Sequence, residues 1–154
     1  MTATVEATAF LREACGGDEG GLIEVLGACV DACVELAAEV AAAPLRRPAA
    51  QAGSAPSINS SGDLQAPLDF LAHGVFTHHV LATGRCDALA SEESEHILTP
   101  EIQYANPEIS CKRARDEGNG FSVVVDPLDG SGNIDCGVGV GTIFGIYPPL
   151  EVAA

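Results

Sequence analysis

The sequence predicts an α/β protein, because helix-like and strand-like segments both occur in it. Two long segments, 22–40 and 64–83, repeat apolar residues with the period of a helix and are followed by helix-breaking residues. Short β-branched or apolar runs, typical of strands, follow at 89–91, 121–125 and 138–147. With 154 residues, of which 47% are hydrophobic, the chain is long enough for one domain with a hydrophobic core.

The net charge of −15 restricts the possible partners. Only seven residues are Lys or Arg, too few to cover a phosphate backbone, so nucleic-acid binding is not expected. The acidity has two interpretations. The carboxylates can form a solvated surface that aids solubility, or some can cluster and require a divalent cation to relieve their repulsion. Both interpretations can hold for different carboxylates.

Nothing in the sequence predicts a membrane span or a secreted protein. Charges interrupt the apolar runs well before the roughly 18 residues that a transmembrane helix needs, and the first ten residues lack the regions of a signal peptide. The six cysteines form no CxxC pair, and Cys29 and Cys33 are expected to be small core residues. We expect a reducing, cytoplasmic location. The plastid stroma is the alternative, because a trimmed chain would hide a transit peptide.

Each expected helix has recognisable ends. The first runs from Leu22 to Val40, and Pro44 follows it. The second, 64–83, has Pro67 in its first turn and Gly84 just beyond its end. Its core-facing side is expected to carry Leu68, Leu71, Val75, His79 and Val80.

Several polar residues allow a structural or a functional interpretation. Asp63 follows a loop at 46–62 and can be only the cap of the second helix, and Asp69 lies where the helix dipole favours an acid. Glu92 and Glu93 are, by themselves, typical of a solvated strand end, and residues 97–119 are expected to be an exposed excursion. The histidines have no metal-ligand spacing and are expected to be ordinary surface or core residues: His73, His78, His79 and His96.

A strand that ends in two carboxylates and a glycine turn, Asp126-Pro-Leu-Asp129-Gly-Ser131, suits metal-assisted phosphoryl hydrolysis. The proline is expected to take the chain out of strand 121–125 at once. Both carboxylates can then converge with the Leu128 carbonyl, and such hard oxygens suit Mg²⁺. The following backbone N–H groups can form an anion nest or open a helical turn.

Three other interpretations of this stretch were weighed. An EF-hand loop beginning at Asp126 would have Leu128 where Asp or Asn is needed and Ser131 where Gly is needed. A dinucleotide fingerprint in Gly137–Gly141 lacks the GxGxxG spacing. A purely structural Asp-Gly turn stays open.

Ser91-Glu92-Glu93 followed by Asp126-Pro-Leu-Asp129-Gly-Ser131 resembles the magnesium-dependent, lithium-sensitive sugar and inositol phosphatases. The extension Gly132-Asn-Ile-Asp135-Cys136 and the run 140–147 resemble class I fructose-1,6-bisphosphatase more specifically. Ser60-Ser-Gly-Asp63 with Leu68-Asp69 is similar to the upstream catalytic loop and helix of that family. The resemblance extends over about residues 22–147.

This resemblance implies a layered α/β (α+β) sandwich in which helices pack on a mixed β-sheet. Residues 1–154 would form a single N-terminal domain, with the C-terminal half of the family fold absent. The expected metal ligands are Glu92, Asp126, the Leu128 carbonyl, Asp129 and, for a further ion, Asp63. The expected catalytic acids are Glu93, which would activate the attacking water, with Asp69 and Asp63, which would support proton transfer. The amides of Gly130 and Ser131 would hold the 1-phosphate.

The implied activity is hydrolysis of the 1-phosphate of fructose 1,6-bisphosphate, in gluconeogenesis or the Calvin cycle, by a homo-oligomer with two or more Mg²⁺ ions, for which Mn²⁺ can substitute. The alternatives are sedoheptulose 1,7-bisphosphate as the substrate, or a non-catalytic fragment that only associates with subunits. The chain departs from the family's AMP contacts at Glu19, Ile23 and Gly120-Phe121, so inhibition by AMP through these contacts is not expected. Because the family's other sugar-binding residues belong to its C-terminal half, we expect little phosphatase activity from this chain alone.

Overall fold

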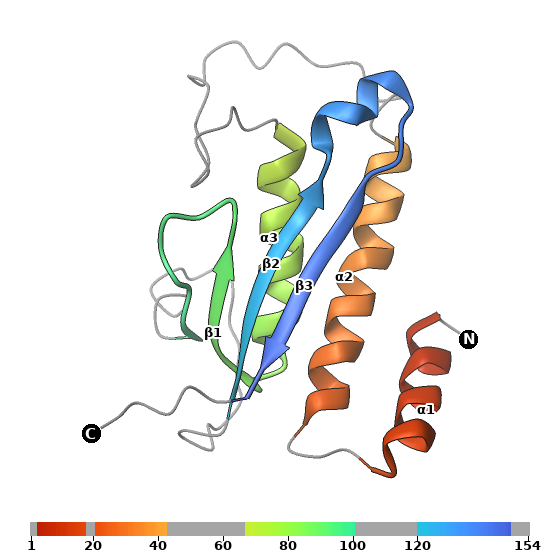
Figure 1. The fold of residues 1–154 in the computed structure, drawn as a ribbon, viewed down its shortest axis with the longest axis vertical. Helices are drawn as coiled ribbons and strands as arrows, with labels where there is room; N and C mark the ends of the chain where they lie inside the picture. Colours follow the sequence, from red (N-terminus) through yellow and green to blue (C-terminus); the bar gives the residue numbers. More distant parts are fainter. Residues whose placement is uncertain (1–2, 18–20, 43–66, 101–119, 149–154) are drawn as a thin grey trace.

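The computed structural model describes residues 3–17, 21–42, 67–100 and 120–148, and it confirms the α/β class (Figure 1). The helices of this part are α1 (Ala3–Cys15), α2 (Leu22–Ala42) and α3 (Pro67–Ala82). Its strands are β1 (Cys86–Ser91), β2 (Phe121–Asp129) and β3 (Gly141–Tyr147), and a 3-10 helix, η2 (Ser131–Cys136), separates the last two. Within these residues no helix is long and apolar enough to cross a membrane.

The strands form one mixed sheet in the order β1-β2-β3. Strand β1 pairs with β2 in parallel, and β2 pairs with β3 in antiparallel orientation. Strand β1 ends at Ser91, which pairs with Val125, whereas β2 continues to Asp129, so the segment that follows β1 leaves the sheet beside Asp126. The mixed sheet that the resemblance implied is therefore present, and its parallel pair determines where the candidate site lies.

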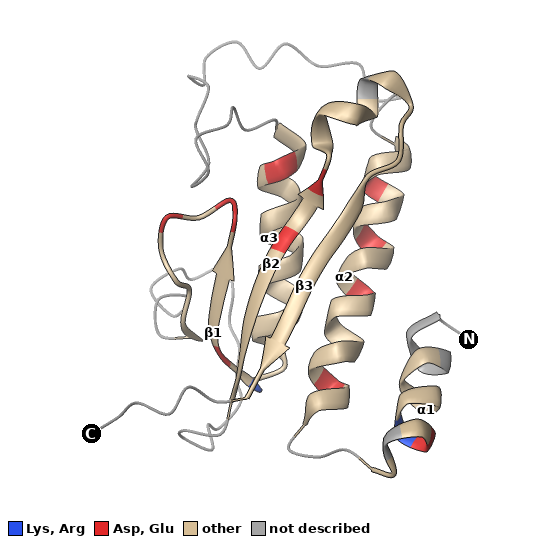
Figure 2. Ribbon diagram, viewed as in Figure 1, with Lys and Arg blue, Asp and Glu red and all other residues tan. Residues whose placement is uncertain are grey.

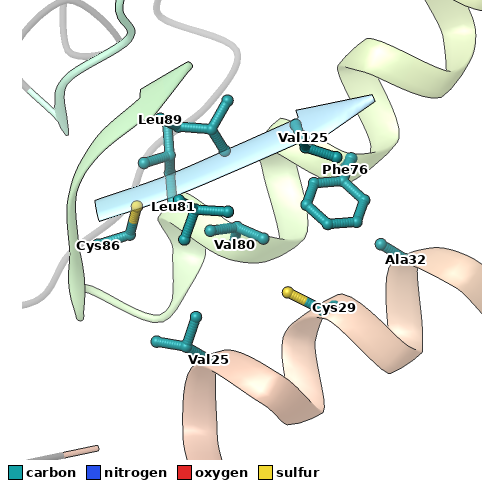
Figure 3. Packing of buried hydrophobic residues seen from close by; sticks show 10 residues of the cluster. Val25, Cys29, Ala32, Phe76, Val80, Leu81, Cys86, Leu89 and Val125 are labelled. Carbon is teal, nitrogen blue, oxygen red and sulfur yellow. The ribbon is translucent and has the colours of Figure 1, made fainter. Parts of the chain in front are cut away.

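Helices α2 and α3 share a hydrophobic core with one face of the sheet. Figure 3 shows side chains of α2, α3, β1 and β2 pointing toward one another, with Val80 of α3 near the middle of the cluster and Phe76 between Val125 and Ala32. Cys29 lies in this core, as expected, and burial raises the pKa of its thiol to about 12. Helix α1 packs on α2, away from the sheet (Figure 1).

The opposite face of the sheet carries exposed apolar side chains. The Ile143 side chain on β3 is 60% exposed, and Val124 on β2 and Tyr147 on β3 are also exposed. Among the residues that the structure describes, the helices cover only the other face (Figure 1). This sheet therefore has one buried face and one open apolar face.

The expectation for the buried side of α3 was correct only in part. Val80 is fully buried, and Leu68 and Val75 are half-buried against the core, whereas Leu71 is 36% exposed. The residues that α3 buries are Asp69, Ala72, Phe76, Thr77, Val80 and Leu81. Apolar residues occur on several sides of this helix, so its sequence pattern does not select one face, and packing against β1 and β2 makes the choice.

Further differences concern the ends and number of the elements. Helix α1 was not predicted, β1 begins at Cys86 and not at residue 89, and β3 begins at Gly141 and not at residue 138. Pro127 does not end β2, which continues to Asp129. The register of β2 and β3 shifts between Asp126 and Asp129, and a proline is tolerated at such an irregularity because no ladder N–H is needed there.

Candidate functional site

The parallel pairing of β1 and β2 brings Glu92 next to Asp126. Ser91 and Val125 form the last pair of the ladder, and the Glu92 N–H donates to the Val125 carbonyl over 3.0 Å. The next residue in each segment is a carboxylate: Glu92 begins the turn after β1, and Asp126 lies within β2 beside the carboxyl end of β1. Ligands of open α/β sheets commonly bind outside the carboxyl ends of the strands. Figure 2 shows acidic positions after β1, near the end of β2 and in the first turn of α3.

The electrostatics of Asp126 show that the two carboxylates interact. Partial burial raises the pKa of Asp126, and its hydrogen bond with Glu92 and the charges of Glu92 and Asp129 raise it further, to about 6. The Leu128 N–H donates to Asp126 Oδ1 over 3.1 Å. This bond lowers the pKa of Asp126, but by less than the other causes raise it. Two carboxylates that share a site repel when both are ionised. A divalent cation held between them would remove that cost.

A short turn fixes the backbone that carries Glu92 and Glu93. The Ser94 N–H donates to the Ser91 carbonyl over 3.1 Å, and the Glu93 N–H donates to Ser91 Oγ over 3.3 Å. A hydroxyl that accepts from the N–H two residues later is the usual serine turn. Both glutamates are half-buried. The backbone that carries Glu92 and Glu93 is therefore held by hydrogen bonds of a turn.

An open groove passes beside the carboxylates of Glu92 and Asp126. Residues 90–92, 124–126 and 143–145 line it, so it extends from Glu92 and Asp126 over the exposed face of the sheet. The groove places an accessible surface next to the carboxylates, as a small-molecule site requires.

The segment after Asp126 is held by a side chain of the neighbouring strand. Pro127 has no N–H, and the ladder between β2 and β3 is irregular there. Thr142 of β3 makes a side-chain contact at this irregularity, because its hydroxyl donates to the Pro127 carbonyl over 2.9 Å. Leu128 is buried against Leu36 and Ala72. The backbone between the two aspartates is thus fixed from both sides.

Replacing Thr142 with Val tests this contact. The variant keeps the shape of the side chain but leaves the Pro127 carbonyl without its donor, so we expect the free energy of unfolding to fall by about 1–2 kcal/mol. Thr142→Ser retains the hydroxyl and should stay within about 0.5 kcal/mol of the unmodified chain. Chemical denaturation of the three proteins measures the difference. Equal stability of the Val and Ser variants would show that the hydroxyl contributes nothing.

The glycine turn after Asp129 opens a short helix, one of the two conformations considered for it. Gly130 has a φ of 78°, in the left-handed region that favours glycine, and it precedes η2. A Cβ at this position would lie 3.0 Å from Asn133 Nδ2. The Asn133 N–H donates to the Gly130 carbonyl over 2.8 Å. Ser131 is the first residue of η2, so its N–H and that of Gly130 lie at the beginning of this helical turn.

Asp69 is buried in the first turn of α3, with 3% of its surface exposed. An attraction to the helix dipole does not require such burial, and burying a carboxylate costs free energy unless hydrogen bonds or charges compensate. The neighbouring Leu68 and Ala72 belong to the cluster that contains Leu128. This packing places the first turns of α3 beside the Asp126–Asp129 segment. Asp63 lies outside the described residues.

The predicted metal ligands are brought together only in part. Glu92 and Asp126 interact directly, and Asp129 is exposed but close enough for its charge to raise the pKa of Asp126. In the described ranges, no three His, Cys, Asp or Glu side chains are grouped closely enough to hold a metal ion. The donor set that is present, carboxylates with a nearby backbone carbonyl, fits a hard divalent cation.

One contact at this site was not predicted. His73 of α3 lies 2.9 Å, through its Nδ1, from Ser91 Oγ, the hydroxyl that also accepts from Glu93. The histidines have no metal-ligand spacing in the sequence. The weaker signal in the sequence is that His73 lies four residues after Asp69, on the same face of the helix.

The match to a family decides the classification. The family described as the N-terminal domain of fructose-1,6-bisphosphatase matches residues 8–153. The chain belongs to this family. The resemblance noted from the sequence is thereby confirmed, and the family is one of phosphatases, which are hydrolases.

Curated fructose-1,6-bisphosphatases agree with this assignment, and a solved structure agrees with the fold. The chain is similar to cytosolic fructose-1,6-bisphosphatases of Arabidopsis thaliana, at 44% identity over 95 residues, and of Spinacia oleracea, at 43% over 95 residues. Each match covers 62% of this chain and 24% of the relative. The fold is similar to that of Leishmania major fructose-1,6-bisphosphatase in holo form, with a TM-score of 0.72 and 24% identity over 96% of this chain and 40% of the other. The chain thus spans about a quarter of these curated fructose-1,6-bisphosphatases.

Proposed function

We propose that this protein is a Mg²⁺-dependent phosphatase that hydrolyses the 1-phosphate of fructose 1,6-bisphosphate. The observation that supports this most directly is the proximity of Glu92 to Asp126 beside the carboxyl end of β1, where Glu92 contributes to the raised pKa of Asp126. The names of the relatives supply the substrate class. Their names also favour a cytoplasmic location over the plastid stroma.

In this proposal, Glu92, Asp126, the Leu128 carbonyl and Asp129 hold the cation, with Asp63 for a further ion. Mg²⁺, or Mn²⁺ in its place, polarises phosphoryl oxygens and lowers the pKa of bound water. The chain's own residues do the rest. The buried Leu128 side chain and the Thr142 bond fix the direction of the backbone carbonyls, and the Ser91 turn fixes the spacing of the two glutamates.

Glu93 is the proposed general base. It follows Glu92 on the same turn, and its N–H is bound to Ser91 Oγ, so the backbone that carries its carboxylate is anchored. Such a carboxylate can orient a water for in-line attack and accept its proton. Asp69 and Asp63 are proposed to support proton transfer. The N–H groups of Gly130 and Ser131, at the beginning of η2, are proposed to bind the 1-phosphate.

We also propose that residues 1–154 form one N-terminal domain of the family fold, and that the remaining contacts to the sugar come from outside this domain. The description of the matching family as an N-terminal domain supports this. The open apolar face of the sheet supports it too, because it leaves room for further protein beside the groove. A homo-oligomer is proposed by analogy with the family.

Phosphate-release assays test the activity. The full-length gene product should release phosphate from fructose 1,6-bisphosphate with Mg²⁺, should lose that activity in excess chelator, and should have a lower kcat/KM for sedoheptulose 1,7-bisphosphate. A preference for the seven-carbon sugar would make sedoheptulose 1,7-bisphosphate the proposed substrate. If neither sugar released phosphate with Mg²⁺, the proposal of phosphatase activity would be wrong. The 154-residue chain alone should be nearly inactive. Rapid Mg²⁺-dependent release from it, abolished by Asp126→Asn, would contradict the domain proposal.

A further inference from the structure

A hydrogen-bonded chain links α3 to the turn that carries the two glutamates. The Glu93 N–H donates to Ser91 Oγ over 3.3 Å, and Ser91 Oγ lies 2.9 Å from His73 Nδ1. Ser91 is the last residue of β1 and is buried, with 6% of its surface exposed. The bond therefore joins two elements of the fold at a protected position, immediately before Glu92.

The donors and acceptors in this chain suit a neutral imidazole. Burial lowers the pKa of His73, which favours the uncharged ring at neutral pH. In the tautomer with its proton on Nε2, the ring accepts the Ser91 O–H at Nδ1 and leaves an oxygen lone pair of Ser91 for the Glu93 N–H. Each bond then polarises the next, which strengthens both. The Ser91 hydroxyl is thereby held in one rotamer.

We propose that His73 is a positioning residue, which holds the Glu92–Glu93 turn in register with Asp126 through the buried Ser91 hydroxyl. This inference rests on the proposed function, because the turn matters only if its glutamates bind a cation and orient water. Outer groups that orient metal ligands commonly change metal affinity by about 10- to 100-fold when they are removed.

The geometry shows where this contact acts. The Glu92 N–H is bound to the Val125 carbonyl of β2, and Leu98 exchanges two backbone hydrogen bonds of 2.8 Å with Leu89 of β1, so both ends of segment 92–98 are fixed to the sheet. Near the beginning of this segment, the Ser94 N–H donates to the Ser91 carbonyl and the Glu93 N–H donates to the Ser91 hydroxyl. His73 connects that hydroxyl to a helix that packs on both β1 and β2. The helix and the carboxylate pair then keep a constant relative position.

Four single variants of the purified chain, together with the double variant His73→Leu/Ser91→Ala, test the proposal with Mn²⁺ alone as the probe. His73→Leu removes the hydrogen bond, whereas His73→Asn places an amide where Nδ1 lies and can restore it. Ser91→Ala removes the other partner. His78→Leu is the matched control, because His78 is an exposed histidine of the same helix. Calorimetric titration measures Mn²⁺ affinity, and amide hydrogen exchange measures protection of the Glu93 N–H.

We expect His73→Leu and Ser91→Ala each to weaken Mn²⁺ binding by about tenfold. The double variant should lose little more than either single one, because the two residues share one bond. His73→Asn should bind within about threefold of the unmodified chain, and His78→Leu should be unchanged. Protection of the Glu93 N–H should fall in the Leu variant and recover in the Asn variant.

Two results would overturn the inference. If His73→Leu binds Mn²⁺ as tightly as the unmodified chain and keeps the Glu93 N–H protected, His73 does not position the turn. If His73→Asn is as weak as His73→Leu while folded, the effect comes from packing and not from the hydrogen bond. A failure of the unmodified chain to bind Mn²⁺ would count against the proposed function instead, and the exchange of the Glu93 N–H would still decide the role of His73.

Discussion

Asp126→Asn is expected to abolish the stabilisation that divalent cations give the protein, while leaving the metal-free fold at least as stable as before. The amide has nearly the shape of the carboxylate, and its oxygen can still accept the Leu128 N–H. Burial and Glu92 raise the pKa of Asp126 to about 6, so at neutral pH the ionised side chain opposes folding of the metal-free protein. Removing that charge removes the repulsion and, with it, a cation ligand.

Thermal unfolding with and without Mn²⁺ or Mg²⁺ separates the two effects. At a cation concentration 100 times the dissociation constant, binding should stabilise the unmodified chain by about 2.7 kcal/mol, and the variant should gain almost nothing. In the full-length gene product the same change should lower kcat/KM by at least about 100-fold. Glu95→Gln removes the same charge from an exposed position of the neighbouring loop and should preserve both properties. A variant that is strongly destabilised without metal would argue for a structural Asp-Gly turn.

Phe76→Ala should produce the largest loss of stability among the core variants. Phe76 has no exposed surface, and its ring lies 5.9 Å from that of Phe144 at an interplanar angle of 45°. It fills the space between α2 and the sheet (Figure 3). Truncating a buried Phe typically costs about 3–5 kcal/mol, through lost transfer free energy and the cavity that remains. Small domains are stable by only about 5–15 kcal/mol.

Urea denaturation of the purified chain measures this effect, and Phe70→Ala is the matched control. Phe70 lies on the same helix but is 50% exposed, so its truncation should cost less than about 1 kcal/mol. Similar losses for both variants would mean that α3 does not bury the face that contains Phe76. A near-complete loss of cooperative unfolding in Phe76→Ala would instead agree with a core centred on this ring.

Features that depend on neighbouring residues could be predicted from the sequence. The repeat of apolar residues and Pro44 indicated the helix from Leu22, which the structure extends to Ala42. The Asp126–Ser131 stretch indicated hard oxygens followed by a glycine turn, because all of its atoms lie within six consecutive residues. Gly130 does adopt the left-handed conformation that such a turn requires. Its proposed binding roles came from a family resemblance, and those roles await the experiments above.

Features that depend on contacts between distant segments could not be predicted. The pairing of Ser91 with Val125 brings Glu92 to Asp126, and no local pattern contains that register. Pro127 was expected to end its strand, because proline lacks an N–H and restricts the residue before it. In the structure the strand continues, and Thr142 of another strand stabilises the irregular ladder. The buried face of α3 was predicted only in part for a similar reason, since several sides of that helix are apolar and the sheet selects one.

The α/β class follows from the local pattern of apolar residues, and the resemblance of short motifs to a known family indicates the family and the residues of a possible cation site. Which of these residues meet depends on tertiary contacts. The tertiary structure brought Glu92 to Asp126 through a parallel strand pair and joined His73 to Ser91 across a helix and a strand. Such contacts depend on the free energy of packing the whole chain, which no segment encodes alone.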